Sequence, residues 1–245
     1  DWVKQMLDKG QRSFYVKQEE KRFYVLPAGR LQEEKQPSQH ISLRQLKEQG
    51  KIIRSNSGAN LIDLGDDVAC LEFVSPNNAI GPDILQMTLA SLEEVRRNYR
   101  GLVIGNEGRH FCVGANLMML LMEAQDENWP AIDQIIQQFQ QTAMAVKYFE
   151  KPVVSAPFGM TLGGGVELAI PAAKVQASAE TYMGLVEAGV GLIPAGGGTK
   201  ELLMRCTIPA DFDGKVDLQP HVNRALETIG MAKVSGSARE AVQLG

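Results

Sequence analysis

The sequence predicts an α/β fold, and three observations carry that prediction. Candidate strands alternate with candidate helices between residues 60 and 177. Apolar residues recur at helical spacing over residues 130–149, which is typical of a long amphipathic helix. A candidate strand over 152–156 leads through three consecutive glycines into another helix. Such an order of elements favours several βαβ crossovers in one main domain.

The first 55 residues are predicted to form an appendage to that domain, which would occupy residues 56–245. The elements expected in the appendage are a short helix ended by Gly10, a hairpin formed by residues 14–16 and 23–26, a polar linker over 31–40, and a helix that runs from the N-cap Ser42 to Gly50.

The main domain is expected to begin with two strands, over residues 60–64 and 68–73, joined by a turn that contains Gly65. The elements that follow are a helix over 84–97, a strand over 102–104, a helix over 116–122, the helix over 130–149, a strand over 152–156, a helix over 164–170 and a strand over 174–177. Ser237 and Glu240 form a capping box that opens a last helix. Because that helix would be interrupted at Gly245 and the chain does not start with Met, we interpret it as a piece of a longer polypeptide.

Composition excludes several classes of function. The 245 residues are 44% hydrophobic and 22% charged, with a net charge of −4 and no cluster of Lys and Arg. Nucleic acid and anionic membrane surfaces are therefore not expected as partners. No apolar run is long enough for a membrane span, and no secretory signal is visible. Three scattered cysteines predict neither disulfides nor a metal site, which favours a reducing cytoplasm as the location.

Glu167 and Glu187 are the most informative residues, because each lies in a glycine-rich frame. Glycines allow a backbone to approach a ligand closely and to present its N–H groups. Two carboxylates beside such a backbone could share a proton transfer, one as base and one as acid. On the residues alone, Glu167 could equally be a helix glutamate favoured by the helix dipole, and Glu187 a solvated loop residue.

Two turns could supply N–H donors to one oxygen. The segment Gly163-Gly-Gly165 precedes a predicted helix, and the segment Phe111-Cys-Val-Gly-Ala-Asn116 likewise leads from a strand region into a helix. Free N–H groups at such positions stabilise a developing negative charge. This arrangement suits chemistry on a carbonyl compound whose oxygen becomes negative in the transition state.

From about residue 60 to residue 245, the chain resembles the enoyl-CoA hydratase/isomerase family, the crotonase superfamily. The segments that carry the resemblance are Asn78-Ala-Ile80, Phe111-Cys-Val-Gly-Ala-Asn-Leu117, Lys151-Pro-Val-Val with Gly163-Gly-Gly-Val-Glu-Leu-Ala169, and Met183-Gly-Leu-Val-Glu187 with Pro194-Ala-Gly-Gly-Gly-Thr199. The resemblance implies the ClpP/crotonase fold of repeated ββα units, here without the family's C-terminal helices.

The resemblance also implies the roles of individual residues. Glu167 and Glu187 match the two catalytic glutamates, and the backbone N–H groups of Val113 and Gly164 match the oxyanion hole. The residues that would contact the substrate are Asn78, Ala79, Gly114, Ala115 and Gly163. No metal ligand is implied.

Family members with other reactions often lack one of the two glutamates, so retention of both favours hydration of a 2-enoyl-CoA to a 3-hydroxyacyl-CoA, as in fatty-acid β-oxidation. Two alternatives stay open. The first is an enoyl-CoA isomerase, which moves a proton and adds no water. The second is a non-catalytic module that binds acyl-CoA or acts as a scaffold.

The N-terminal residues carry a second resemblance. Residues 1–10 and Ser13-Phe-Tyr15 resemble the end of the C-terminal domain of 3-hydroxyacyl-CoA dehydrogenases. This implies a bifunctional protein in which a covalently fused dehydrogenase precedes the hydratase. The chain itself lacks a dinucleotide-binding fingerprint, so no cofactor is expected in it, and NAD would bind only to the dehydrogenase part. The family resemblance also implies an assembly of identical subunits.

Overall fold

The computed structural model describes residues 2–18, 21–25, 31–33, 40–208 and 216–245, and the chain divides into two compact units, residues 1–41 and 42–245. The first unit contains α1 (Trp2–Asp8) and an antiparallel sheet of β1 (Tyr15–Gln18), β2 (Lys21–Val25) and β3 (Leu31–Glu33). The predicted hairpin is confirmed, since Tyr15 pairs with Tyr24. The expectation of a linker from residue 31 is wrong for β3, because this strand pairs with β2; residues 34–39 lie outside the described part.

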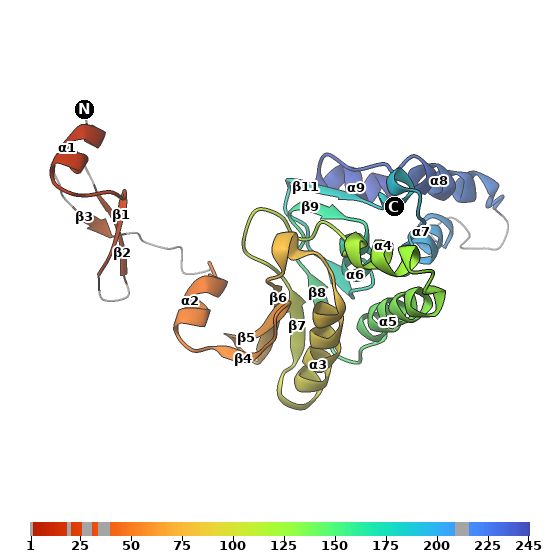
Figure 1. The fold of residues 1–245 in the computed structure, drawn as a ribbon, viewed down its shortest axis with the longest axis horizontal. Coiled ribbons are helices and arrows are strands. Elements are labelled where there is room, and N and C mark those ends of the chain that lie inside the picture. The colour runs from red at the N-terminus through yellow and green to blue at the C-terminus, as the bar shows by residue number, and fades with distance from the viewer. Residues whose placement is uncertain (1, 19–20, 26–30, 34–39, 209–215) are drawn as a thin grey trace. The chain divides into compact units, whose positions relative to one another are not determined.

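The second unit is an α/β fold built on a six-stranded sheet (Figure 1). The strands of this sheet are β4 (Ile52–Ser55), β5 (Ala59–Gly65), β6 (Val68–Phe73), β7 (Gly101–Ile104), β8 (Val153–Ser155) and β10 (Lys174–Val175), in the order β10-β8-β7-β6-β5-β4. β5 pairs antiparallel with β4 on one side and with β6 on the other, whereas the pairs β6–β7, β7–β8 and β8–β10 are parallel. The parallel part requires helical crossovers, as predicted.

Helices cover both faces of this sheet because strand side chains alternate between faces. Leu61 and Leu71 join the main core, which includes residues of α3 (Pro82–Asn98). Ile62 and Cys70 point the other way and pack against Leu43 of α2 (Leu43–Glu48). The core therefore lies mainly between the sheet and α3.

The two units meet between residues 41 and 42, whereas the predicted boundary lies after residue 55. α2 and β4 belong to the second unit, because β4 pairs with β5 and the buried carboxylate of Glu72 accepts hydrogen bonds of 2.7 and 2.8 Å from Lys47 of α2. The carboxylate of Glu107 accepts further hydrogen bonds from the first two N–H groups of α2. The predicted N-cap Ser42 is confirmed by its hydrogen bond from the Gln45 N–H.

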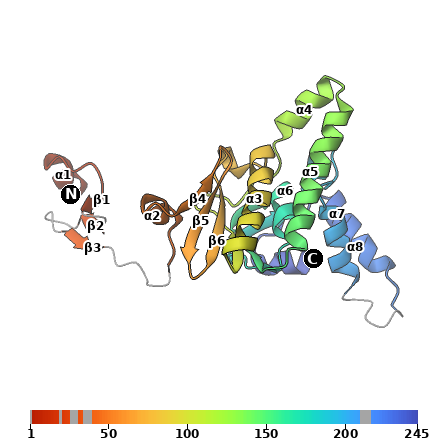
Figure 2. The ribbon, with the colours of Figure 1, turned by 90° about the horizontal axis from the view of Figure 1, so that it is seen from below.

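This unit also contains a separate parallel sheet of two strands, and α6 (Gly164–Ala169) follows directly on one of them. The sheet consists of β9 (Gly159–Leu162) and β11 (Thr181–Gly184). The remaining helices of this unit are η2 (Pro76–Asn78), α4 (Leu117–Gln125), α5 (Trp129–Lys147), η3 (Glu187–Val190), α7 (Gly198–Thr207), α8 (Gln219–Gly230) and α9 (Ala238–Leu244). Figure 2 shows α4 and the start of α5 projecting together from the rest of this unit. No helix in the described part of the chain is long and apolar enough to cross a membrane.

Candidate active site

The turn between β9 and α6 contains Gly163 and leads into Gly164, whose backbone N–H is the second predicted oxyanion donor. Gly163 has φ +52° and ψ −123°, a conformation that favours glycine. Its own N–H donates a hydrogen bond of 2.8 Å to the carbonyl of Gly184 on β11. Every residue of α6 is buried, so the helix that follows this turn is held on all sides. Gly164 is its first residue.

The turn over residues 111–116 lies against the start of α6. A Cβ on Gly164 would lie 3.2 Å from the Ala115 nitrogen, and a Cβ on Gly114 would lie 3.7 Å from the Gly164 nitrogen. Gly114 has φ +111°, and its N–H donates to the Cys112 sulfur at 3.4 Å. Within residues 40–208, neither the Val113 N–H nor the Gly164 N–H donates a hydrogen bond to another protein group. The structure therefore brings together the two turns that the sequence singled out.

Two asparagine side chains hold the first of these turns. The amide of Asn78 donates hydrogen bonds of 3.1 Å to the carbonyls of His110 and Phe111. The amide of Asn106 donates a bond of 2.7 Å to the same Phe111 carbonyl, and its oxygen accepts one of 2.7 Å from the Phe73 N–H on β6. Asn106 was not predicted as a site residue, because its sequence context gives no sign of these long-range bonds.

Glu167 is a buried carboxylate on α6, with 5% of its surface exposed. Its Oε1 accepts a hydrogen bond of 2.8 Å from the Gly198 N–H at the start of α7. A Cβ on Gly196 would lie 2.7 Å from its Oε2, so the backbone of this segment passes closer than a side chain would permit. Burial raises the pKa of Glu167 to about 7; the hydrogen bond from Gly198 lowers it and the charge of Glu187 raises it.

Glu187 begins η3 and faces the same turn. A Cβ on Gly163 would lie 3.1 Å from its Oε1, while its Oε2 is buried and has no hydrogen-bond partner in the described part of the chain. Burial raises the pKa of this carboxyl as well. The two glutamates repel each other electrostatically, as the contribution of Glu187 to the pKa of Glu167 indicates. Ionisation of Glu187 therefore opposes ionisation of Glu167, although burial is the larger cause of the raised pKa.

Both glutamates line one cavity of about 590 Å³. The other lining residues come from the turn before α4, from α4 and α5, and from the segment between η3 and α7; they are Ala115, Leu117, Met118, Leu120, Leu121, Ala124, Trp129, Ile132, Ile135, Ile136, Phe139, Val190, Leu192, Ile193, Ala195 and Gly196. Of the residues expected to contact a substrate, Ala115 lines this cavity. Asn78, Ala79, Gly114 and Gly163 are not among its lining residues, and the first acts instead on the backbone of the 111–116 turn.

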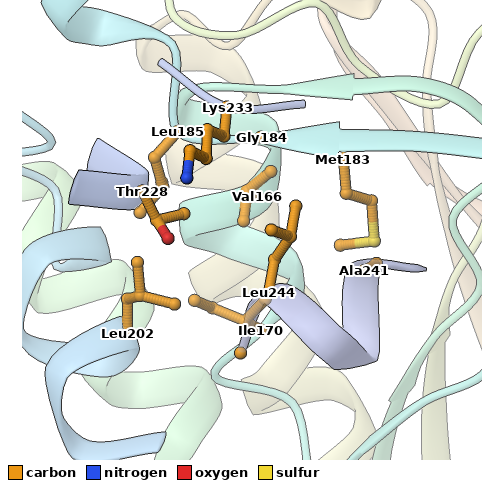
Figure 3. Close-up of a pocket in the computed structure, with 11 residues that line it drawn as sticks. Val166, Ile170, Met183, Gly184, Leu185, Leu202, Thr228, Lys233, Ala241 and Leu244 are labelled. Atoms are coloured by element: carbon orange, nitrogen blue, oxygen red, sulfur yellow. The ribbon is translucent and has the colours of Figure 1, made fainter. Parts of the chain in front are cut away.

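Two other cavities among the described residues are smaller, and one of them, of about 240 Å³, lies between α3 and the end of α5. A cavity of about 70 Å³ lies between α6, β11, α7 and α9 and is lined by apolar side chains with Lys233 and Thr228 (Figure 3). The three cysteines are free and buried, and no three His, Cys, Asp or Glu side chains among the described residues gather as metal ligands would. The two carboxylates of the 590 Å³ cavity are therefore the candidate reactive groups of this unit.

Comparisons with known proteins agree with this geometry. Residues 64–208, more than half of the chain, match the family model described as enoyl-CoA hydratase/isomerase. Among curated proteins, a probable 3-hydroxyacyl-CoA dehydrogenase of Bacillus subtilis is 54% identical over 99% of this chain and 30% of its own length. A probable enoyl-CoA hydratase of the same organism is 31% identical over 52% of this chain and 49% of its own length.

Solved structures share the fold. An enoyl-CoA hydratase from Polaromonas is 26% identical with a TM-score of 0.64, covering 76% of this chain and 68% of that one. An enoyl-CoA hydratase from Geobacillus kaustophilus is 28% identical with a TM-score of 0.61, covering 77% and 66%. The chain spans less than a third of the length of the probable 3-hydroxyacyl-CoA dehydrogenase and of a putative fatty acid oxidation complex trifunctional enzyme of Rickettsia prowazekii, at 30% and 23%. Its glycine turns and family-model match together show that this chain belongs to the enoyl-CoA hydratase/isomerase family, with the crotonase fold.

Proposed function

We propose that this chain adds water to a 2-enoyl-CoA and forms a 3-hydroxyacyl-CoA. The observation that carries the proposal is that two carboxylates, Glu167 and Glu187, line one apolar cavity beside two turns with free N–H groups. Hydration needs a base for the attacking water and an acid for the α-carbon, and the two glutamates supply one of each. Acyl-CoA is the substrate in this proposal, and no cofactor takes part.

The N–H groups of Val113 and Gly164 act on the thioester oxygen. When the water oxygen adds to C3, the thioester becomes an enolate, and negative charge develops on its oxygen. Two donors that are already oriented and not otherwise bonded stabilise this charge without reorganisation, each by about 3 kcal/mol. The close packing of Gly114 against Gly164 keeps the two donors in one place.

The glutamates act on the water. The ionised carboxylate removes a proton from the water as its oxygen bonds to C3, and the protonated carboxyl gives a proton to C2. The atoms of one water are thereby added to the substrate. The glutamate that was ionised is now protonated, and the other glutamate is now ionised. The raised pKa of Glu167, about 7, makes a shared proton available near neutral pH.

The test is the loss of absorbance of the conjugated thioester when the protein is mixed with 2-enoyl-CoA substrates of several chain lengths. Hydration supports the proposal. Conversion of a 3-enoyl-CoA to the 2-enoyl isomer without hydration would assign the isomerase reaction instead. The absence of both reactions, with acyl-CoA still bound, would leave a binding module.

The proposal includes a fused 3-hydroxyacyl-CoA dehydrogenase and a role in fatty-acid β-oxidation. The curated relatives include proteins named as a probable 3-hydroxyacyl-CoA dehydrogenase and as a putative fatty acid oxidation complex trifunctional enzyme, each much longer than this chain. A dehydrogenase would oxidise the alcohol that hydration produces, so the two reactions follow one another chemically. The buried, unpaired cysteines fit the cytoplasm as location, and assembly into identical subunits belongs to the same proposal.

A further inference from the structure

We infer that the substrate carries a long, unsubstituted hydrocarbon chain of about ten carbons or more, and that this chain lies between α4 and α5. The inference rests on the proposed function, because it extends the same cavity outward from the glutamates. It is carried by the composition of α4, by the direction and volume of the cavity, and by the largely apolar side chains of its walls.

α4 is an apolar helix without a buried residue. Its sequence is Leu-Met-Met-Leu-Leu-Met-Glu-Ala-Gln, and the exposed fractions of Met118 and Leu121 are 64% and 50%. Trp129 of α5 and Ile193 of the facing segment are 62% and 73% exposed. These side chains line the cavity, so the exposed apolar surface is the wall of one groove that begins at the two carboxylates.

The cavity has an inner and an outer end. Phe139 lies at the inner end, since its ring is 3.3 Å from a Cβ placed on Gly164 and close to Gly196 beside Glu167. Ala124 lies near the end of α4, about 10 Å along the helix axis from Leu117 at 1.5 Å per residue. A chain that starts at the thioester can therefore extend along α4 away from the reacting carbons.

The volume of the cavity exceeds the needs of a short acyl group. The cavity measures about 590 Å³. A methylene group is close in size to a water molecule, whose share of the liquid is about 30 Å³, so four carbons fill roughly 120 Å³ and sixteen carbons roughly 480 Å³. A four-carbon substrate would leave most of the apolar wall without a partner.

The walls contain no positively charged side chain that would bind an acidic acyl chain. Among the lining residues, the charged side chains are Glu167 and Glu187, which lie at the reacting end, and no Lys, Arg or His is present. A terminal carboxylate on the chain would lose its hydration without gaining a positively charged partner. The geometry therefore selects a plain hydrocarbon chain.

The first experiment measures kcat/KM for 2-enoyl-CoA substrates of four, eight, twelve and sixteen carbons, each below its micelle concentration. Each buried methylene should raise kcat/KM about fourfold until the groove is filled. Binding of the saturated four-carbon and sixteen-carbon acyl-CoA is measured by calorimetry alongside, because these ligands cannot be hydrated.

Variants on one helix make the test specific. Ala124→Trp fills the outer end of the groove and should lower the ratio of the sixteen-carbon to the four-carbon kcat/KM by at least tenfold. Met122→Trp adds the same bulk to an exposed residue of α4 that does not line the cavity and should leave that ratio unchanged. Leu121→Glu, at a half-exposed position where folding is not at risk, should lower the ratio through a charge beside the chain.

The outcomes are distinct. Hydration with equal kcat/KM for all lengths, or equal effects of Ala124→Trp and Met122→Trp, would overturn the inference and leave the proposed function standing. Tighter binding of the sixteen-carbon ligand without any turnover would overturn the proposed function and support the inference. A change of oligomeric mass in Leu121→Glu with an unaltered ratio would make this apolar wall a contact between copies of the chain, and would overturn the inference.

Discussion

The buried carboxylate of Glu167 accepts a hydrogen bond of 2.8 Å from the backbone N–H of Gly198, which lies 31 residues further along the chain. This bond ties α6 to the start of α7 and orients the carboxylate. A Cβ on Gly198 would lie 3.0 Å from the same oxygen, so the approach depends on glycine. The bond lowers the pKa of Glu167, but burial outweighs it and holds the pKa at about 7.

This pKa predicts how stability depends on pH. Because the folded-state pKa of about 7 exceeds the ordinary value of 4.5, the stability contributed by the neutral side chain is full below pH 4.5 and is lost as pH rises through 7. Glu167→Gln has no such charge to bury. The free energy of unfolding of the wild type, relative to this variant, should therefore fall by about 3 kcal/mol between pH 4 and pH 8. Urea unfolding at each pH measures the free energy of unfolding of both proteins. If the difference between them did not change with pH, folding would not raise the pKa of Glu167.

Replacing either glutamate should slow hydration about as much as replacing both. Glu167→Gln and Glu187→Gln should each slow hydration severely, with little change in the binding of saturated acyl-CoA, because each removes one half of the proton transfer. The double variant should be only slightly slower than the slower single variant, because residues that act as a unit are not additive. Turnover rates of the four proteins measure this. A near-normal rate of hydration in Glu187→Gln would remove this residue from the mechanism.

The oxyanion turn can be tested through its backbone. Val113→Pro removes the free N–H and should lower kcat by about 100- to 1,000-fold, whereas Val113→Ala keeps the N–H and should retain most activity. Circular dichroism of both variants checks that the fold survives. Equal activity of the two variants would mean that this N–H does not contact the thioester oxygen.

Asn106 should act by positioning that turn. Asn106→Asp keeps the acceptor for the Phe73 N–H but loses the donor to the Phe111 carbonyl. We expect kcat to fall by about tenfold or more while KM changes little, because a small displacement of the donors costs transition-state stabilisation. Asn223→Asp, at an exposed position of α8, is the matched control. A rise in KM with kcat unchanged would place Asn106 in substrate binding instead.

The chain should not bind a nicotinamide cofactor, because its sequence lacks the dinucleotide-binding fingerprint. Calorimetric titration of NADH into the protein should give no heat of specific binding. A micromolar site would contradict this expectation, and it would also argue against placing the dehydrogenase activity in a separate part of the protein.

Local signals in the sequence predicted most elements of the second unit. Ser42 and Ser237 cap their helices as expected, since an N-cap depends on residues within one turn. The strands over 60–64 and 68–73 pair as expected because Gly65 and the two aspartates after it adopt positive φ in the turn between them. The role of β4 was missed although its partner β5 follows it directly in the sequence. The ion pair of the buried Glu72 with Lys47 joins residues that are 25 positions apart, so no local pattern predicts it.

The sequence by itself determined the glycine turns, the order of the two glutamates and, through their arrangement, the family. Only the tertiary structure decided that Gly163 and Gly114 bring two free N–H groups together, and that Gly198 bonds to Glu167. The tertiary structure also decided that both carboxylates end at one apolar groove. The physical reason is that a motif specifies backbone conformation over a few residues, whereas burial, pKa and cavity shape come from packing between segments that the motif does not contain.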